Sequence, residues 1–164
     1  MDKKPFYIIR AAQDKSTVDI FFMGPIASWN KNVDPDGFAA NFMAKCSKAP
    51  KVRAWMHTPG GDVFGGNAIY NTLKSYKGSL EFYNIGVVAS MGSIIYQVPG
   101  AKRYMASNSR MMIHPPSGGC YGQASELEAT AKLLKSLNAD FKKQLKANTG
   151  ATEEVVNEDR KSVV

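Results

Sequence analysis

The chain has 164 residues, the length of a single domain, and 44% of them are apolar while 21% are charged. A chain of this size and composition can bury a core without disulfide or metal staples, which excludes a disordered polypeptide. The net charge of +7 would suit an anionic partner, but the Lys and Arg residues are spread along the sequence, so we interpret the charge mainly as solubility and keep nucleic-acid binding as a minor alternative.

The elements predicted by apolar periodicity and by Gly and Pro breaks alternate between strand and helix. In chain order they are the strand Val18–Met23, the helix Phe38–Ser47, the strand Val52–His57, the helix Phe64–Tyr76, the strand Leu80–Ile85, the helix Met91–Val98, the short strands Arg103–Ala106 and Arg110–Ile113, the long helix Ser125–Ala147 and a last helix that begins at Thr152. This alternation predicts one α/β domain over residues 1–164, with right-handed βαβ units and a largely parallel sheet.

The predicted helix over Ser125–Ala147 would be about 35 Å long, which is long for so small a domain. We expect part of it to project from the domain and to pack against another subunit, although its apolar stripe could instead pack wholly on its own sheet. The stripe consists of Leu127, Ala131, Leu134, Leu137, Phe141 and Leu145.

Cysteine usage and hydropathy indicate the compartment. Cys46 and Cys120 are 74 positions apart and form no CxxC pair, which argues against a disulfide framework or a zinc site and fits a reducing compartment. The apolar run Phe6–Ile9 is shorter than the ~7–15 residues of a signal peptide, and no stretch reaches the ~18 apolar residues of a membrane span. We therefore expect a cytoplasmic protein without a membrane segment.

Ser90 is the first candidate for chemistry, because it lies between an apolar strand end and a buried helix. At a helix N-terminus, unpaired N–H groups and the helix dipole favour developing negative charge, and the small neighbours Ala89 and Gly92 allow a substrate to approach. The position predicts either a nucleophile or an ordinary helix cap, since serine is also a preferred N-cap residue.

The run Thr58-Pro59-Gly60-Gly61 and the histidines are the other candidates. Paired glycines let backbone amides face a ligand, as an oxyanion hole requires, although the same pair also suits an ordinary βα turn. His57 and His114 are the two histidines available as an imidazole base, and His114 follows the strand Arg110–Ile113. Cys120 is a possible nucleophile in principle, but no second feature supports it, and we interpret it as structural.

A Gly-Gly loop, a serine and a histidine at successive strand ends, in this order, resemble the proteolytic subunit of the Clp protease (ClpP). The resemblance is carried by three stretches between His57 and Gly150, which read TPGGDVFGGNAIYNTLK, GVVASMGSIIYQVPGAKRYMASNSRMMIHPP and GGCYGQASELEATAKLLKSLNADFKKQLKANTG. The segment DIFFMGPI, Asp19–Ile26, is similar to the first core strand and turn of that family. The PGGDVF and TG-x-x-x-E patterns are most similar to the phage and prophage branch, the head maturation proteases, whose substrates would be scaffold or capsid precursors.

The resemblance implies an α/β fold of the ClpP/crotonase type, built from repeated ββα and βαβ units with a long handle helix. It implies a serine endopeptidase in which Ser90 is the nucleophile, His114 the general base, and the amides of Gly61 and Met91 the oxyanion hole, with no cofactor and no metal. His57 stands where that family commonly has a polar residue such as Asn, and we expect it to shape the loop rather than to act as a base.

The resemblance also implies a toroidal homo-oligomer, in one ring or in stacked rings, that takes peptide or protein substrates and excludes folded proteins. The long helix would belong to the handle that joins rings. An AAA+ unfoldase is a possible partner that the sequence does not establish, because the first 17 residues match the family weakly.

The family's third catalytic residue is an aspartate that orients the histidine, and gapless counting places it near Val163, which cannot take this role. Asp159 is the nearest carboxylate, and three explanations stay open: a local shift that brings Asp159 to the histidine, a truncated or matured chain, or a degenerate, poorly active member of the family. A family member would continue into a final strand and helix, so we expect the C-terminal part of the fold to be missing through truncation, processing or degeneration.

Two other functions remain open from the sequence. One is a catalytically weak assembly or binding protein, motivated by the missing aspartate. The other is an acyl-CoA enzyme of the related crotonase fold, which uses a similar glycine-built oxyanion hole but has no use for the pair Ser90 and His114.

Overall fold

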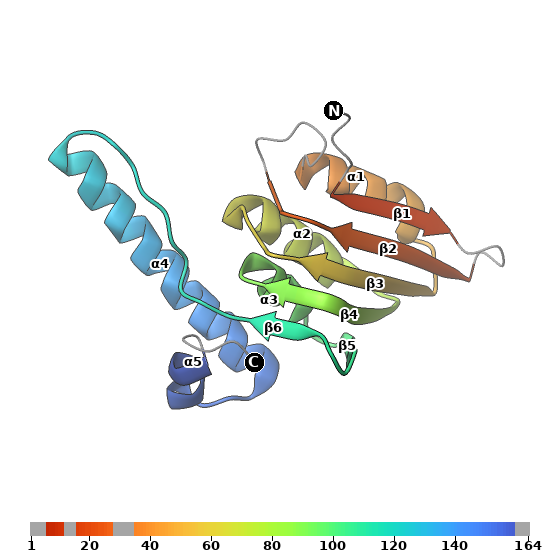
Figure 1. Ribbon diagram of the computed structural model, residues 1–164. Helices are drawn as coiled ribbons and strands as arrows, with labels where there is room; N and C mark the ends of the chain where they lie inside the picture. Colours follow the sequence, from red (N-terminus) through yellow and green to blue (C-terminus); the bar gives the residue numbers. More distant parts are fainter. Residues whose placement is uncertain (1–5, 12–15, 28–34, 160–164) are drawn as a thin grey trace.

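The computed structural model describes residues 6–11, 16–27 and 35–159, which form one twisted sheet with helices against it and a long helix that extends to one side (Figure 1). The strands are β1 (Tyr7–Ala11), β2 (Thr17–Met23), β3 (Lys51–Thr58), β4 (Ser79–Ala89), β5 (Lys102–Met105) and β6 (Arg110–Met112). The helices are α1 (Pro35–Cys46), α2 (Val63–Ser75), α3 (Met91–Tyr96), α4 (Ala124–Thr149) and α5 (Glu153–Asp159).

The sheet has the order β1-β2-β3-β4-β5, and β6 also pairs with β4. β1 is antiparallel to β2, whereas all other pairs are parallel. The predicted α/β fold with a largely parallel sheet is therefore confirmed. Because the carboxyl ends of parallel strands meet at one edge of a sheet, this topology gathers the loops after β3, β4 and β6 on the same side of the molecule.

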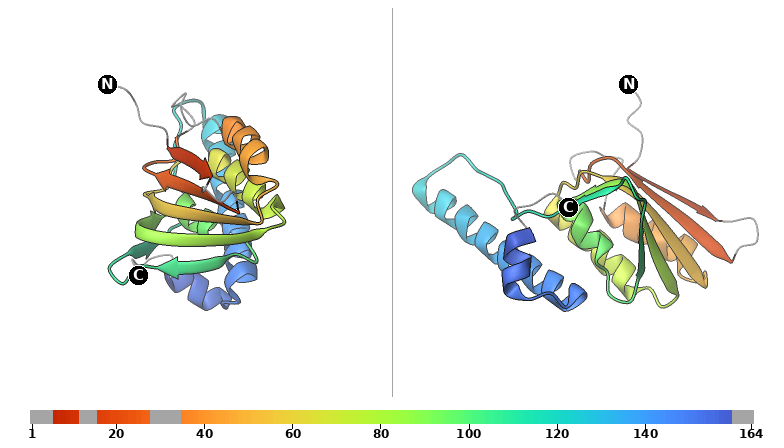
Figure 2. Two further views of the ribbon diagram at one scale, coloured as in Figure 1. Left: turned by 90° about the vertical axis from the view of Figure 1, so that its right-hand side faces the viewer. Right: turned by 60° about the horizontal axis from the view of Figure 1, so that its bottom comes forward.

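Helices α1, α2 and α3 lie on one face of the sheet, as the two views of Figure 2 show. Burial along β2 and β3 accordingly alternates with a period of two, because successive side chains point to opposite faces. The largest fully buried side chains lie between the sheet and these helices, and they include Phe22, Phe38, Phe42, Met56 and Phe82.

The structure differs from the sequence-based prediction at two strands. β1 was not predicted. It is a short strand whose residues are only partly buried or exposed, and Arg10 interrupts its apolar run, so its sequence pattern is weak. The strand predicted over Leu80–Ile85 continues to Ala89, beyond the residue pair Ile85 and Gly86 that suggested its end. The register shift within this strand, described below, explains why the pattern broke there.

The long helix α4 projects from the domain at its N-terminal end, as expected (Figure 1). Its buried residues are Phe141 and Leu145, near its C-terminal end, whereas Leu127 and Leu133 are 48% and 46% exposed. Gly150 ends the helix in the left-handed conformation, with φ of 72°, which glycine adopts readily. Within the apolar stripe, Phe141 and Leu145 are thus buried, whereas Leu127 and Ala131 are exposed.

Within the described residues, no helix is both long and apolar enough to cross a membrane. Cys46 is buried and Cys120 is exposed, and both thiols are free. The same part of the chain contains no cluster of three or more His, Cys, Asp or Glu side chains suited to a metal ion.

Candidate active site

Ser90 occupies the sharp turn between β4 and α3. Its φ of 54° makes it the one non-glycine residue with a positive φ among those that the structure describes. It stands at the N-cap position of α3, but its side chain makes no capping hydrogen bond. The hydroxyl instead lies 2.8 Å from Nε2 of His114, so the alternative role as a helix cap does not describe this side chain. A strained backbone that is retained at a strand-to-helix turn is a feature of nucleophile sites.

Close packing of small residues makes room for this turn. A Cβ on Gly60 would lie 2.6 Å from both the Ala89 carbonyl oxygen and the Ser90 Cβ. A Cβ on Gly92 would lie 2.6 Å from Cγ2 of Thr58. Gly60 in the loop after β3 and Gly92 in α3 therefore let that loop lie directly against the serine.

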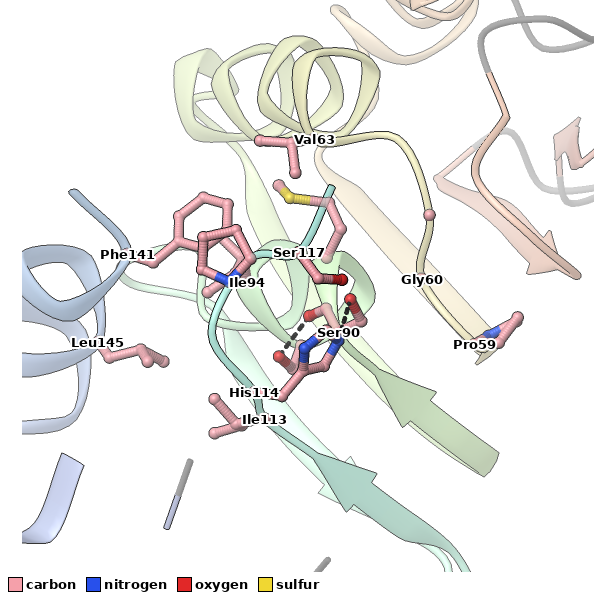
Figure 3. Close-up of a pocket in the computed structure, with 14 residues that line it drawn as sticks. Pro59, Gly60, Val63, Ser90, Ile94, Ile113, His114, Ser117, Phe141 and Leu145 are labelled. Carbon is pink, nitrogen blue, oxygen red and sulfur yellow. Dashed lines mark hydrogen bonds between the residues drawn. The ribbon is translucent and has the colours of Figure 1, made fainter. Parts of the chain in front are cut away.

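His114 follows β6, and both nitrogens of its imidazole have partners (Figure 3). Nδ1 lies 2.6 Å from the carbonyl oxygen of Pro115. Because a carbonyl oxygen can only accept, Nδ1 carries the proton, and the lone pair of Nε2 is left to accept from the Ser90 hydroxyl. This is the tautomer in which an imidazole can remove a proton from serine.

The glycine loop after β3 borders the same region, and the Gly60 N–H donates within the loop to the Thr58 Oγ1 at 3.1 Å. Gly60 and Gly61 have φ of 88° and 143°, values that glycine adopts readily. The segment is held by two backbone bonds, from the Ile26 N–H to the Gly60 oxygen and from the Asp62 N–H to the Ile26 oxygen. In a parallel bridge of this kind, the residue between the two bonds directs its own N–H away from the partner strand, so the Gly61 amide points away from Ile26.

These residues border one cavity of about 380 Å³. Its polar wall contains Ser90, His114 and Ser117, and its apolar wall is formed by Val63, Met91, Ile94, Ile113, Phe141 and Leu145 (Figure 3). The apolar side chains come from α2, α3, the C-terminal half of α4 and the segment just after β6. The cavity can therefore receive an apolar side chain while a carbonyl group lies against the serine.

Four of the predicted site residues come together at this cavity, namely Gly61, Ser90, Met91 and His114. Asp159 is the last residue of α5, and its side chain, like the position of Val163, lies outside the described part of the structure. His57 lies at the end of β3, and its Nδ1 is 3.3 Å from the Val87 nitrogen. Cys120 is exposed and receives a hydrogen bond from the Thr130 hydroxyl.

Two parts of the site were not anticipated from the sequence. The Pro115 carbonyl is a backbone group, and only the rigid Pro115-Pro116 pair hinted at a fixed turn after His114. Phe141 and Leu145 were assigned to the apolar stripe of the long helix and not to a cavity. The periodicity of one helix does not show which distant residues its side chains will lie beside. Both contributions depend on tertiary packing.

The sequence matches the family described as Clp protease over residues 19–163. The matched region begins within β2 and includes all the helices, the glycine loop, Ser90 and His114.

Proposed function

The chain belongs to the Clp protease family, and from this premise we propose that it is a serine peptidase in which Ser90 is the nucleophile and His114 the general base. The observation that carries the proposal is the 2.8 Å contact between the Ser90 Oγ and the His114 Nε2, at a residue with φ of 54°. Family membership supports the peptidase class, and this contact supports the assignment of the two residues.

In the proposed mechanism, the Ser90 Oγ attacks the carbonyl carbon of a peptide while the His114 Nε2 takes the hydroxyl proton. The resulting imidazolium then gives this proton to the leaving amine, and an acyl-serine forms. Water attacks the acyl-serine with the same imidazole as base, which releases the product acid and restores the hydroxyl. The Pro115 carbonyl holds the Nδ1–H throughout, and so keeps the ring in its productive orientation.

We assign the oxyanion hole to the amides of Gly61 and Met91. The N–H of Met91 has no acceptor within its own helix, because Met91 is the first residue of α3. The N–H of Gly61 is directed away from the bridge to Ile26. Two such fixed donors stabilise the tetrahedral intermediate, and one donor of this kind changes the rate by about 10²–10³-fold.

For the third member of the site, Asp159 remains our proposal, because it is the carboxylate nearest in sequence to the family position. The Pro115 carbonyl already orients His114, so the contribution of Asp159 would be to stabilise the imidazolium. An Asp159→Asn variant tests this, since a loss of about 10⁴-fold is typical when a triad carboxylate is removed. Wild-type activity in this variant would exclude the assignment.

Members of the Clp protease family generally form oligomeric rings. We propose that this chain does so as well, with the projecting end of α4 in the contact between copies, since Leu127 and Leu133 are half-exposed there. Peptides or unfolded proteins would then reach Ser90 from inside the ring. The finer assignment to phage head maturation proteases depends on the PGGDVF and TG-x-x-x-E patterns, and cleavage of capsid or scaffold precursors encoded near its gene would test it.

The decisive experiment is labelling of the purified chain with a fluorophosphonate, followed by intact mass measurement. We expect one added probe in wild type, none in Ser90→Ala and none in His114→Ala. Ser107→Ala, which changes a serine in the turn between β5 and β6, is the matched control and should label as wild type does. A folded, oligomeric wild-type protein that takes up no probe would favour the alternative of a catalytically weak assembly protein.

A further inference from the structure

β4 changes its neighbours halfway along its length. Its first part, Glu81–Asn84, pairs with β5, whereas its last part, Val87–Ala89, pairs with β6. Since β6 leads directly to His114 and β4 leads directly to Ser90, the place where β4 leaves β5 and meets β6 determines how the serine and the histidine face each other.

The change of neighbours coincides with an irregularity in the pairing of β4 with β3. Met56 pairs with Asn84 and Thr58 pairs with Val88, so that β3 advances by two residues while β4 advances by four. The two extra residues make a bulge, which leaves backbone N–H groups of β4 without their usual partners in the ladder. A bulge of this kind keeps its shape only if other groups satisfy those donors.

Two side chains satisfy them. The Oδ1 of Asn84, a residue that is 1% exposed, accepts from the Gly86 N–H at 3.1 Å, and its Nδ2 donates to the Arg110 carbonyl on β6 at 2.9 Å. The Nδ1 of His57 accepts from the Val87 N–H at 3.3 Å. His57 is the residue of β3 that stands between the two pairs, and therefore opposite the bulge.

The fit between His57 and Gly86 is close. A Cβ on Gly86 would lie 2.5 Å from the His57 Nδ1 and 3.2 Å from its Cε1. The imidazole thus occupies the space that a side chain at residue 86 would need. The Nδ1 that lies against Gly86 is the same atom that accepts the Val87 N–H.

We propose that His57 is a positioning residue, whose imidazole closes the β4 bulge and thereby sets the approach of Ser90 to His114. The inference rests on the proposed peptidase function for its catalytic consequence. The bulge is followed by Val88, Ala89 and Ser90, and the Ser90 N–H is bonded to β6 at Met112. Opening the bulge would let Val87–Ala89 shift against β6, and a displacement of about 1 Å at a reacting atom lowers a rate by about 10²-fold.

A pair of variants of equal shape tests the hydrogen bond. In His57→Asn, the side-chain Oδ1 takes the position of the histidine Nδ1, because both atoms are bonded to Cγ. It can therefore accept the hydrogen bond from the Val87 N–H. In His57→Leu, a methyl group replaces that acceptor. We expect His57→Leu to lower the fluorophosphonate labelling rate and kcat for a peptide by about 10–100-fold with little change in KM, while His57→Asn retains most of the wild-type rate.

Gly86→Ala provides an independent test, because its Cβ would displace the imidazole without removing it. We expect the same loss of rate as in His57→Leu, and no further loss when the two changes are combined, since both open the same bulge. Equal labelling rates in His57→Leu and His57→Asn would overturn the proposal, as would a wild-type rate in Gly86→Ala.

Hydrogen exchange of the Val87 amide separates a failure of this inference from a failure of the proposed function. Exchange should be slow in wild type and in His57→Asn, and faster in His57→Leu, whether or not the protein hydrolyses peptides. If wild type does not label but this order of exchange rates holds, the bulge contact stands and the peptidase assignment fails. If all three proteins exchange Val87 at the same rate, the positioning role of His57 is excluded even in an active enzyme.

Discussion

The backbone N–H of Ser90 donates a 2.8 Å hydrogen bond to the carbonyl of Met112. The residue that carries the hydroxyl is therefore tied to the end of β6, two residues before His114. This bond and the contact between the Ser90 Oγ and the His114 Nε2 form two connections between the same segments, so the site is held at the backbone as well as at the side chains.

The first prediction concerns the glycine loop. In Gly61→Ala, a Cβ would overlap the Ile26 carbonyl, and the φ of 143° would be strained for alanine. The Gly61 amide should move, and peptide hydrolysis should fall by about 10²–10³-fold or more, the effect of losing one oxyanion donor. The measurement is kcat/KM on a fluorogenic peptide. Gly119→Ala, at a glycine with open space around its Cβ position, is the control and should behave as wild type.

The second prediction concerns the choice of substrate. Because Ile94, Ile113, Phe141 and Leu145 line the cavity beside Ser90, we expect cleavage after apolar residues. In a series of fluorogenic peptides that differ only at the residue before the scissile bond, leucine should exceed aspartate in kcat/KM by at least about 100-fold, since an unpaired carboxylate would be desolvated there. Similar values for the two peptides would show that this cavity does not receive that side chain.

The third prediction concerns the projecting end of α4. Leu133→Glu should reduce the assembled mass without lowering the melting temperature much, because Leu133 is 46% exposed in the single chain. Native mass spectrometry and a thermal melt measure the two effects. Phe141→Glu is the contrasting variant, since Phe141 is 5% exposed and its replacement should unfold the chain itself. An unchanged mass in Leu133→Glu would remove this end of α4 from the interface.

The fourth prediction concerns thiol reactivity. Burial raises the pKa of the Cys46 thiol to about 11, with a smaller opposing effect from Lys45, so the thiolate is scarce at neutral pH. An Ellman titration of the native protein should therefore show one fast thiol, Cys120. In Cys120→Ser, reaction should appear only after a denaturant is added. Fast reaction of the native Cys120→Ser protein would mean that the core around Cys46 opens readily.

The fifth prediction concerns acid stability and depends on two carboxyl groups in the sheet, those of Asp19 and Glu81. Burial alone would raise the pKa of the Asp19 carboxyl, but hydrogen bonds from Arg53 and Trp55 together outweigh it and hold the pKa below its ordinary value. Glu81 is similar, with burial opposed by hydrogen bonds from Lys51 and Tyr83. A carboxyl whose pKa is lowered by folding stabilises the protein above its unfolded-state pKa, of about 4, and this stability disappears as the pH falls through the lower folded value.

Thermal melts between pH 2 and pH 7 measure this effect. The melting temperature should fall steeply below about pH 4 in wild type, and less steeply in Asp19→Asn, which should also lose about 1.5–3 kcal/mol at neutral pH because its charge-assisted bonds are weakened. Asp140→Asn, at an exposed position of α4, is the matched control. If Asp19→Asn kept the wild-type pH dependence, the pairing with Arg53 would contribute nothing measurable.

Much of the architecture could be predicted from sequence because local rules determine it. Among the described elements, periodicity and Gly or Pro breaks located the helices and the strands other than β1. The prediction that β4 would end at Ile85 was wrong, because a bulge interrupts the pattern without ending the strand. Such a bulge is defined by the register of two strands about thirty residues apart, which no local pattern contains.

For the site, the sequence by itself determined which residue types stand at the strand ends, and the order of a Gly-Gly loop, Ser90 and His114 carried the family resemblance that implied the chemistry. Only the tertiary structure decided that Ser90 bonds to His114 rather than capping α3, that the Pro115 carbonyl holds the imidazole, and that α4 closes the apolar wall. The physical reason is that hydrogen bonds and cavities depend on distances between atoms on different elements. Those distances are set when the sheet assembles and the helices pack, and not within any one segment.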